Sequence, residues 1–103
     1  MLRIINGKRY NTETATEVLA IDNPYPRSDF KYEDTSLYIT KAGTWFLAGE
    51  GHALSRWARC NGNTYGPGQG IEPISSQDAQ AILEQHDQTE LVEKYFSNNI
   101  SDA

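Results

Sequence analysis

The sequence predicts an α+β fold, in which an antiparallel sheet of about four to six strands is followed by two short C-terminal helices packed on one of its faces. Two observations support this prediction. Up to residue 74, apolar and β-branched residues occur in short runs between turn residues, as in strands joined by tight turns. From residue 75, apolar residues recur at intervals of three and four, which is the period of a helix.

The chain is expected to begin with a hairpin over residues 4–10. Asn6-Gly7 follows two isoleucines, and this dipeptide is typical of a type I′ turn, whose two central residues both need a positive φ. Residues 11–23 then mix a strand-like alternation of threonines with later apolar positions. We expect one turn of helix at the threonines and a strand at residues 17–22. Asn23-Pro24-Tyr25-Pro26 ends that strand, because prolines cannot donate to a central ladder.

A central hairpin is predicted from residues 36–40 and 44–48. Both runs are rich in β-branched and aromatic side chains, and the loop between them ends in Gly43, as an αL position requires. Glycines at positions 49 and 51 are expected to break the second strand.

Turn residues are frequent between the central hairpin and the helices. We expect a strand at residues 55–60, which ends at Asn61-Gly62-Asn63, and a loop at residues 65–70. Residues 71–74 are expected to form a final edge strand. The sheet is therefore complete before the helical period begins.

Two short helices are predicted after Ser75. Ser75 and Asp78 have the spacing of a capping box, in which the serine hydroxyl accepts from the Asp78 amide. Each helix has one apolar stripe, formed by Ala79, Ile82, Leu83 and His86 in the first and by Leu91, Val92, Tyr95 and Phe96 in the second. Residues 87–90 repeat the capping pattern, which favours a second helix that begins there. The alternative is one helix kinked near Asp87. Residues 97–103 are expected to be a frayed tail.

The length of 103 residues is that of one domain, so residues 1–103 are predicted to form a single unit. No stretch approaches the ~20 apolar residues that a membrane helix needs. Residues 1–7 lack the apolar run of a secretory signal. Cys60 is the only cysteine, which excludes an intrachain disulfide and favours a reducing compartment. We therefore expect a cytoplasmic protein with no membrane partner.

The net charge of −5 is unevenly distributed along the chain. Residues 1–71 contain seven acidic and eight basic residues, whereas residues 72–103 contain seven acidic residues and Lys94 alone. An acidic C-terminal third repels phosphates, so no direct nucleic-acid partner is expected. The same charge suits a basic protein partner.

Few residues suggest covalent or metal chemistry. Cys60 could pair with His52 or His86 as a nucleophile, but a core thiol and structural histidines are the simpler interpretation. One cysteine and two distant histidines have no zinc-ligand spacing, so no metal and no cofactor are expected. Exposed aromatics on one sheet face could stack single-stranded nucleic acid, although the helices should cover many of them.

Glu50, His52 and Arg56 form a possible pocket. A carboxylate between two glycines at the end of an apolar strand could act as a general base, with Arg56 as its partner. The alternative is that the glycines shape a bulge or turn, while Glu50 pairs with Arg56 or caps backbone amides.

The acidic helices suggest a partner-binding surface. Glu84 and Asp87 are three residues apart on the expected solvent side, about 5–6 Å from each other, and Glu90 and Glu93 repeat this spacing. Carboxylates at that separation approximate the phosphate spacing of a nucleic-acid strand, so the face could imitate DNA. The alternative is an ordinary solubilising face.

Several motifs occur in an order that resembles one protein family. They are I-N-G-K-R-Y-N-T-E-T-A at residues 5–15, L-Y-I-T-K at 37–41, W-F-L-A-G-E-G at 45–51 and P-I-S at 73–75. Together they resemble a family of small uncharacterised proteins of phages, plasmids and other bacterial mobile elements, over residues 4–86. Most members have no assigned function. They usually have a further glycine where this chain has His52, so a site built on that glycine pair would differ here.

By analogy of size, acidity and source, the chain is similar to anti-CRISPR proteins. This analogy implies a non-enzymatic inhibitor in the bacterial cytoplasm that binds a Cas protein or the CRISPR surveillance complex and blocks DNA binding. Its partner-binding residues would be Glu84, Asp87, Glu90 and Glu93, with Glu72 and Asp78 nearby. The inhibitor would be a monomer or a homodimer.

Two other functions stay open. The first is a small enzyme or ligand-binding domain that uses Glu50, His52 and Arg56. The second is a homodimeric accessory protein of mobile DNA.

Overall fold

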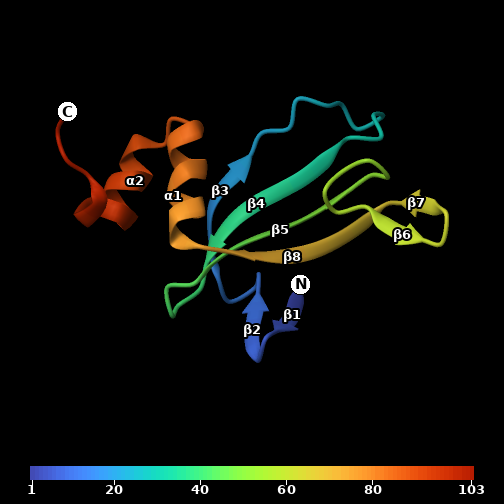
Figure 1. Ribbon diagram of the computed structural model, residues 1–103, viewed down its shortest axis with the longest axis horizontal. Helices are drawn as coiled ribbons and strands as arrows, with labels where there is room; N and C mark the ends of the chain where they lie inside the picture. The colour runs from blue at the N-terminus through green and yellow to red at the C-terminus, as the bar shows by residue number, and fades with distance from the viewer.

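The computed structural model describes residues 1–103 and has an α+β fold, with the strands first and the helices last (Figure 1). The predicted fold class is therefore confirmed. The elements are β1 (Leu2–Ile5), β2 (Lys8–Asn11), β3 (Thr16–Ile21), β4 (Glu33–Ile39), β5 (Trp45–Gly51), β6 (Arg59–Asn61), β7 (Thr64–Gly66), β8 (Gly68–Ile74), α1 (Ser76–Gln85), α2 (Thr89–Phe96) and the 3-10 turn η1 (Ser97–Asn99).

Four strands form the main sheet in the order β3-β4-β5-β8, and every neighbouring pair is antiparallel. The β1-β2 and β6-β7 hairpins lie outside this sheet as separate two-stranded ribbons. Figure 1 shows the two helices near one end of the sheet and the β6-β7 hairpin near the other. The molecule is elongated, with principal extents of 49 × 33 × 21 Å.

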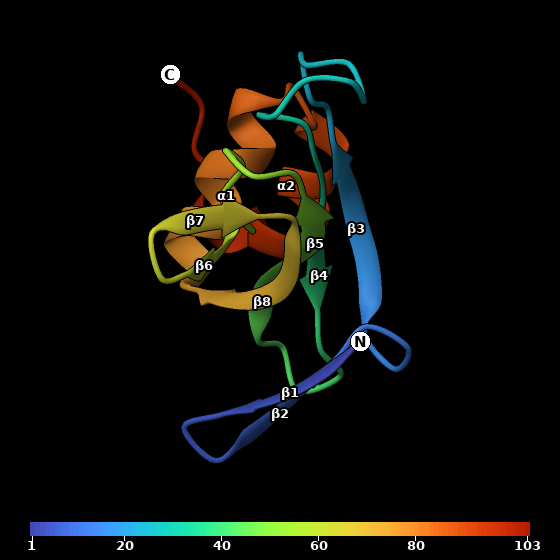
Figure 2. The ribbon, with the colours of Figure 1, turned by 90° about the vertical axis from the view of Figure 1, so that its right-hand side faces the viewer.

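The N-terminal hairpin forms at the predicted turn. Asn6 and Gly7 both have positive φ, 51° and 76°, as a type I′ turn requires. After β2, the amides of Thr14 and Ala15 both bond to the Asn11 carbonyl, which gives one tight turn before β3. Figure 2 shows the hairpin lying across the end of the main sheet, beside the β4–β5 turn.

The expectation that glycines break the second central strand is wrong. Gly49 and Gly51 continue β5 in regular register with β4 and β8. A Cβ built on Gly49 would lie 2.8 Å from Nε1 of Trp57 and would also collide with the Asp34 carbonyl. Glycine is therefore needed here because the Trp57 indole lies directly on the strand, and not because the strand ends.

The segment after β5 also differs from expectation. Residues 55–60 were expected to be a strand, but Ser55 and Ala58 form consecutive turns, with amides bonded to the carbonyls of His52 and Ser55. These turns place Trp57 on the sheet, where its Nε1 donates to Oγ1 of Thr35 over 2.8 Å. Satisfying the indole N–H stabilises this position, since an unpaired buried donor is costly.

The loop expected at residues 65–70 is instead ordered into strands. β7 ends at Gly66, and β8 begins at Gly68 rather than at residue 71. Gly68 through Gly70 pair with the far end of β5, whose continuation past Gly49 provides the partner groups. β8 is an edge of the main sheet, as predicted for residues 71–74.

The two faces of the sheet have separate cores. One face joins the helices and Trp57 in a cluster that consists of Leu37, Trp45, Leu47, Trp57, Ala79, Leu83, Val92 and Phe96. On the other face, Tyr10 of the hairpin packs edge-on against Phe46, with ring centroids 5.5 Å apart, beside Ala48. The alternation of Trp45, Phe46 and Leu47 along β5 divides these clusters, as strand geometry requires.

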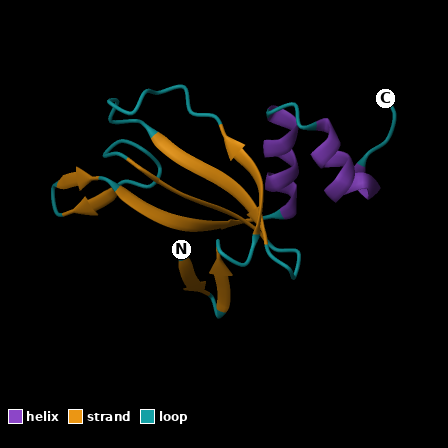
Figure 3. Ribbon diagram, turned by 180° about the vertical axis from the view of Figure 1, so that it is seen from behind, coloured by secondary structure: helices purple, strands orange, loops and turns teal.

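The C-terminal region forms two helices (Figure 3). Ser75 Oγ accepts from the Asp78 amide over 3.0 Å, so the first predicted cap is confirmed. The second is wrong, because Gln88 occupies the N-cap of α2 and makes no side-chain cap hydrogen bond. Asp87, the expected cap, instead lies in the turn that ends α1, with φ 55°.

Candidate functional site

Five carboxylates on the two helices and the turn between them form what we call the acidic layer: Asp78, Glu84, Asp87, Glu90 and Glu93. All five are exposed. None makes an ion pair, because both ion pairs of the chain involve Arg56. Lys94 is the one cation on the helices, and its Nζ lies 5.2 Å from the centroid of the Tyr95 ring. The negative charge of this layer is therefore not neutralised within the chain.

Three of these carboxylates converge where the two helices meet. Glu84, Asp87 and Glu93 line a shallow hollow of about 250 Å³, together with Val92 and Ile100. Ile100 is 44% exposed, so part of the hollow has an apolar lining within reach of solvent. An apolar surface rimmed by carboxylates fits a long cationic side chain, whose stem packs on apolar groups while its charged end meets the acids.

Asp87 has an uncommon backbone conformation. The Gln88 amide bonds to the Leu83 carbonyl over 2.9 Å and the Asp87 amide to the Glu84 carbonyl over 3.2 Å, which is the pattern of a Schellman C-cap. Its αL position usually contains glycine, because a Cβ is strained there. Here the position holds Asp87, whose carboxylate lines the same hollow as those of Glu84 and Glu93.

Glu84, Asp87 and Glu93 around this hollow form what we call the acidic corner. Glu72 and Asp78 lie apart from it. Glu72 lies on β8, where its carboxylate is 3.5 Å from NH1 of Arg56. Asp78 lies in the first turn of α1, roughly 9 Å along the helix axis from Glu84 at 1.5 Å per residue. The compact part of the predicted surface therefore consists of Glu84, Asp87 and Glu93, and Glu90, in the first turn of α2, does not line the hollow.

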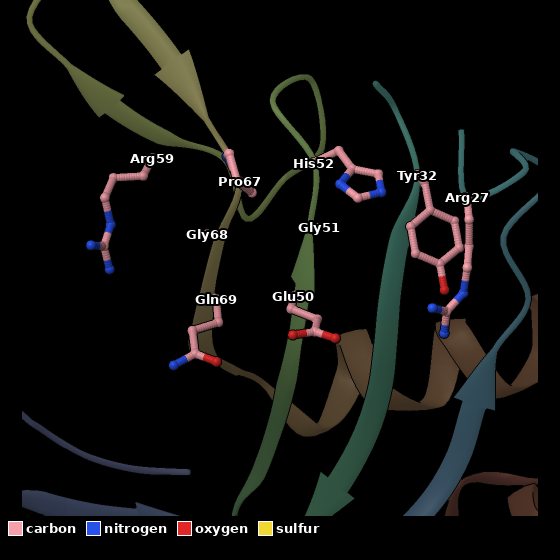
Figure 4. A pocket seen from close by; sticks show the side chains of 9 residues that line it. All are labelled: Arg27, Tyr32, Glu50, Gly51, His52, Arg59, Pro67, Gly68 and Gln69. Carbon is pink, nitrogen blue, oxygen red and sulfur yellow. The ribbon is translucent and has the colours of Figure 1, made fainter. Parts of the chain in front are cut away.

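Glu50 and His52 line a different hollow, of about 670 Å³, at the far end of the sheet (Figure 4). Its other side chains come from the β3–β4 loop, β6, the link between β7 and β8, and β8, and they are Arg27, Tyr32, Arg59, Pro67 and Gln69. The ring centroids of Tyr32 and His52 lie 5.2 Å apart. The Glu50 side chain is exposed and, in register, faces Asp34 and Gln69 across the neighbouring strands.

Arg56 does not join Glu50 and His52. Its Nε lies 3.4 Å from the Glu33 carboxylate, and its NH1 contacts Glu72. The expected pairing of Glu50 with Arg56 is therefore wrong, as is the expected glycine bulge, because β5 pairs regularly through Gly51. The cause is the turn that carries Trp57, which takes Arg56 to the helix-covered face of the sheet.

The remaining predicted chemistry is dispersed. Cys60 is exposed in β6, where its thiol hydrogen-bonds to the Gly62 carbonyl, so the expected core position is wrong. His86 is half-buried at the end of α1. No group of three His, Cys, Asp or Glu side chains is arranged to hold a metal ion. Neither helix has the length and apolarity that a membrane crossing requires.

The open part of the other sheet face contains a further acidic group that the sequence analysis missed. Glu17, Asp34 and Glu50 line one polar hollow with Tyr38. Asp34 and Glu50 lie directly opposite each other, an arrangement of like charges that destabilises a sheet. The predicted central hairpin spans residues 36–48. Extending both of its strands to residues 34 and 50 would have predicted that Asp34 and Glu50 are neighbours.

Burial raises the pKa of Tyr38 above its ordinary value of 10.0, and the carboxylates of Glu17 and Asp34 add to the shift. The folded protein thus holds this proton more tightly than the unfolded chain does. The stability that protonated Tyr38 contributes should be fully present below pH 10, and it should be lost as the pH rises through the pKa of the folded state. Urea unfolding of the Tyr38→Phe variant should show a weaker decline over that alkaline range, and an identical decline would contradict the assignment.

Comparisons with known proteins add no further constraint. No protein-family model matches the chain, and neither curated proteins nor solved structures give a significant match. The resemblance to small mobile-element proteins therefore stays a prediction.

Proposed function

We propose that the protein is a non-enzymatic inhibitor carried by a mobile element, and that it binds a basic, nucleic-acid-binding surface of another protein through its acidic layer. The proposed partner is a Cas protein or the CRISPR surveillance complex, which would lose access to DNA. The class of partner follows from the charge of the layer, and the choice of a CRISPR component follows from the analogy with anti-CRISPR proteins.

The conformation of Asp87 is the observation that supports this proposal best. A carboxylate at an αL position costs local stability, and placing it beside Glu84 and Glu93 adds electrostatic repulsion. Local choices that oppose the fold are expected at functional sites. A basic partner relieves the repulsion, because it brings opposite charge to the same corner.

Binding would be steered by charge and anchored at the hollow. Exposed carboxylates attract a basic surface from a distance, which speeds encounter at low salt. A lysine or arginine of the partner then fits between the Glu84 and Glu93 carboxylates with its stem on Val92 and Ile100. Such binding weakens as salt rises, since the Debye length falls from about 30 Å at 0.01 M to about 10 Å at 0.1 M.

A pull-down from lysate of a CRISPR-bearing bacterium tests the proposal directly. The tagged protein is washed at low and at high salt, and retained proteins are identified by mass spectrometry. We expect a Cas component that is retained at low salt and lost at high salt. If no Cas component is retained under either wash, the proposed partner is wrong.

Substitution of Asp87 separates the stability of the corner from its binding. Asp87→Gly should raise the free energy of unfolding by about 1 kcal/mol, because glycine adopts αL without strain. Asp87→Asn should change it little, since asparagine also tolerates αL. Both variants should bind the partner more weakly. Urea unfolding and a binding titration measure the two effects, and a glycine variant that binds as well as the parent would contradict a role for this carboxylate.

The hollow at Glu50 and His52 supports a second candidate function, the binding of a small ligand. It has Arg27 and Arg59 on opposite flanks and the Glu50 carboxylate between them (Figure 4). An NMR screen of small polar ligands tests this function. A ligand that binds should change the chemical shifts of the Gly51 and His52 amides. The third function, a homodimeric accessory protein, is tested by light scattering.

A further inference from the structure

A hollow of positive charge lies between the N-terminal hairpin and the turn that joins β4 to β5. Its volume is about 450 Å³, and three cations line it: Lys8 and Arg9 of β2, and Lys41 of the turn. No acidic residue contributes to the lining. We call this site the basic hollow. No local pattern in the sequence indicates the basic hollow, because residues 8–9 and 41 meet only after the hairpin packs across the sheet (Figure 2).

The three cations have no partners within the chain. Both ion pairs of the protein involve Arg56, so Lys8, Arg9 and Lys41 are free of carboxylates within 4.0 Å. All three side chains are exposed. Like charges around one hollow repel each other, and an anion bound between them would relieve that repulsion.

Residues with hydroxyl or amide side chains also line the hollow, and these are Thr14, Thr40, Thr44, Asn11 and Tyr10. Thr40 Oγ1 accepts from the Thr44 amide over 3.0 Å, which leaves its own hydroxyl proton to donate to a ligand. Lysine, arginine, threonine, asparagine and tyrosine are the side chains that bind phosphate oxygens in protein–nucleic acid complexes.

We propose that the basic hollow binds phosphate groups of a nucleic-acid backbone without reading its bases. The acidic layer does not oppose this, because none of its residues lines the hollow and salt screens charges over about 10 Å at 0.1 M. No exposed aromatic side chain lines the hollow, since Tyr10 is 5% exposed and packs on Phe46, so stacking on bases is not expected. The inference does not rest on the proposed function, although both would bring the protein to a nucleoprotein complex.

Fluorescence anisotropy with two labelled 12-nucleotide single strands of different sequence tests the proposal. We expect equal affinity for both strands, and log K should fall with log salt at a slope of about −2 for three contacts. In the Lys8/Lys41→Gln variant the slope should shrink by about 1.4 and the affinity at 50 mM salt should fall at least about tenfold. The matched control is Lys31/Lys94→Gln, which removes the same charge from exposed lysines outside the hollow and should bind like the parent.

Inorganic phosphate distinguishes a backbone from a free anion. A strand should bind at least about tenfold more tightly than inorganic phosphate at equal phosphate concentration, since neighbouring phosphates contact separate cations. Equal affinity would overturn the assignment to nucleic acid. The proposal also fails if the Lys8/Lys41 variant and its control weaken equally, or if vesicles with anionic lipid bind and the strands do not. None of these outcomes depends on the pull-down, which probes the helices.

Discussion

Reversing two charges of the acidic layer, in Glu84/Glu93→Lys, should weaken partner binding at least about 100-fold. Close charge pairs at a protein interface couple by about 1.5 kcal/mol or more, and reversal replaces attraction by repulsion at both positions. Both side chains are exposed and line the corner hollow, so the fold should tolerate the change. A binding titration against the captured partner, at two salt concentrations, measures the effect.

The matched control is Glu13/Asp102→Lys. These residues are also exposed and form no ion pair, and the variant has the same net charge as the first. It should bind within a few-fold of the parent, because screening limits the reach of distant charges. If both variants lose affinity equally, net charge alone decides binding and the acidic corner has no specific role.

Gly49→Ala should lower the free energy of unfolding by about 3 kcal/mol, at the upper end of the usual cost of overpacking. The new Cβ would meet the Asp34 carbonyl and lie 2.8 Å from Nε1 of Trp57. The strand cannot move away, since β5 is paired on both sides. The indole cannot move without breaking its hydrogen bond to Thr35. Urea unfolding measures the change.

Gly66→Ala is the control for that variant. An added Cβ at Gly66 meets no atom within 4 Å, and the residue does not have a positive φ. Its free energy of unfolding should change by less than about 1 kcal/mol, with a gain expected if anything changes. A Gly49 variant as stable as this control would contradict the placement of Trp57 on β5.

Local signals predicted several parts of the fold. Asn6-Gly7 fixed the first turn, Ser75 capped the first helix, and the alternation of Trp45, Phe46 and Leu47 divided the two cores. These predictions hold because each depends on residues only a few positions apart, whose backbone preferences or hydrogen bonds form locally.

The predictions of secondary structure were wrong where a contact between distant residues overrides a local backbone preference. Local patterns predicted a strand break at Gly49 and Gly51 and a strand over residues 55–60. In the structure the Trp57 indole is buried against β5. The turns over residues 52–58 bring it there, and Gly49 leaves room for it on the strand. Since that contact spans two elements, no local pattern in either segment indicates it.

The same division applies to the candidate sites. The sequence by itself determined that the C-terminal third is acidic and helical, because charge and periodicity are properties of the chain. Only the tertiary structure decided which charges meet. It gathers Glu84, Asp87 and Glu93 at one corner, pairs Glu72 with Arg56 elsewhere, and brings Lys8, Arg9 and Lys41 around one hollow. The physical reason is that electrostatic interactions depend on distance in space, which packing sets, and not on separation along the chain.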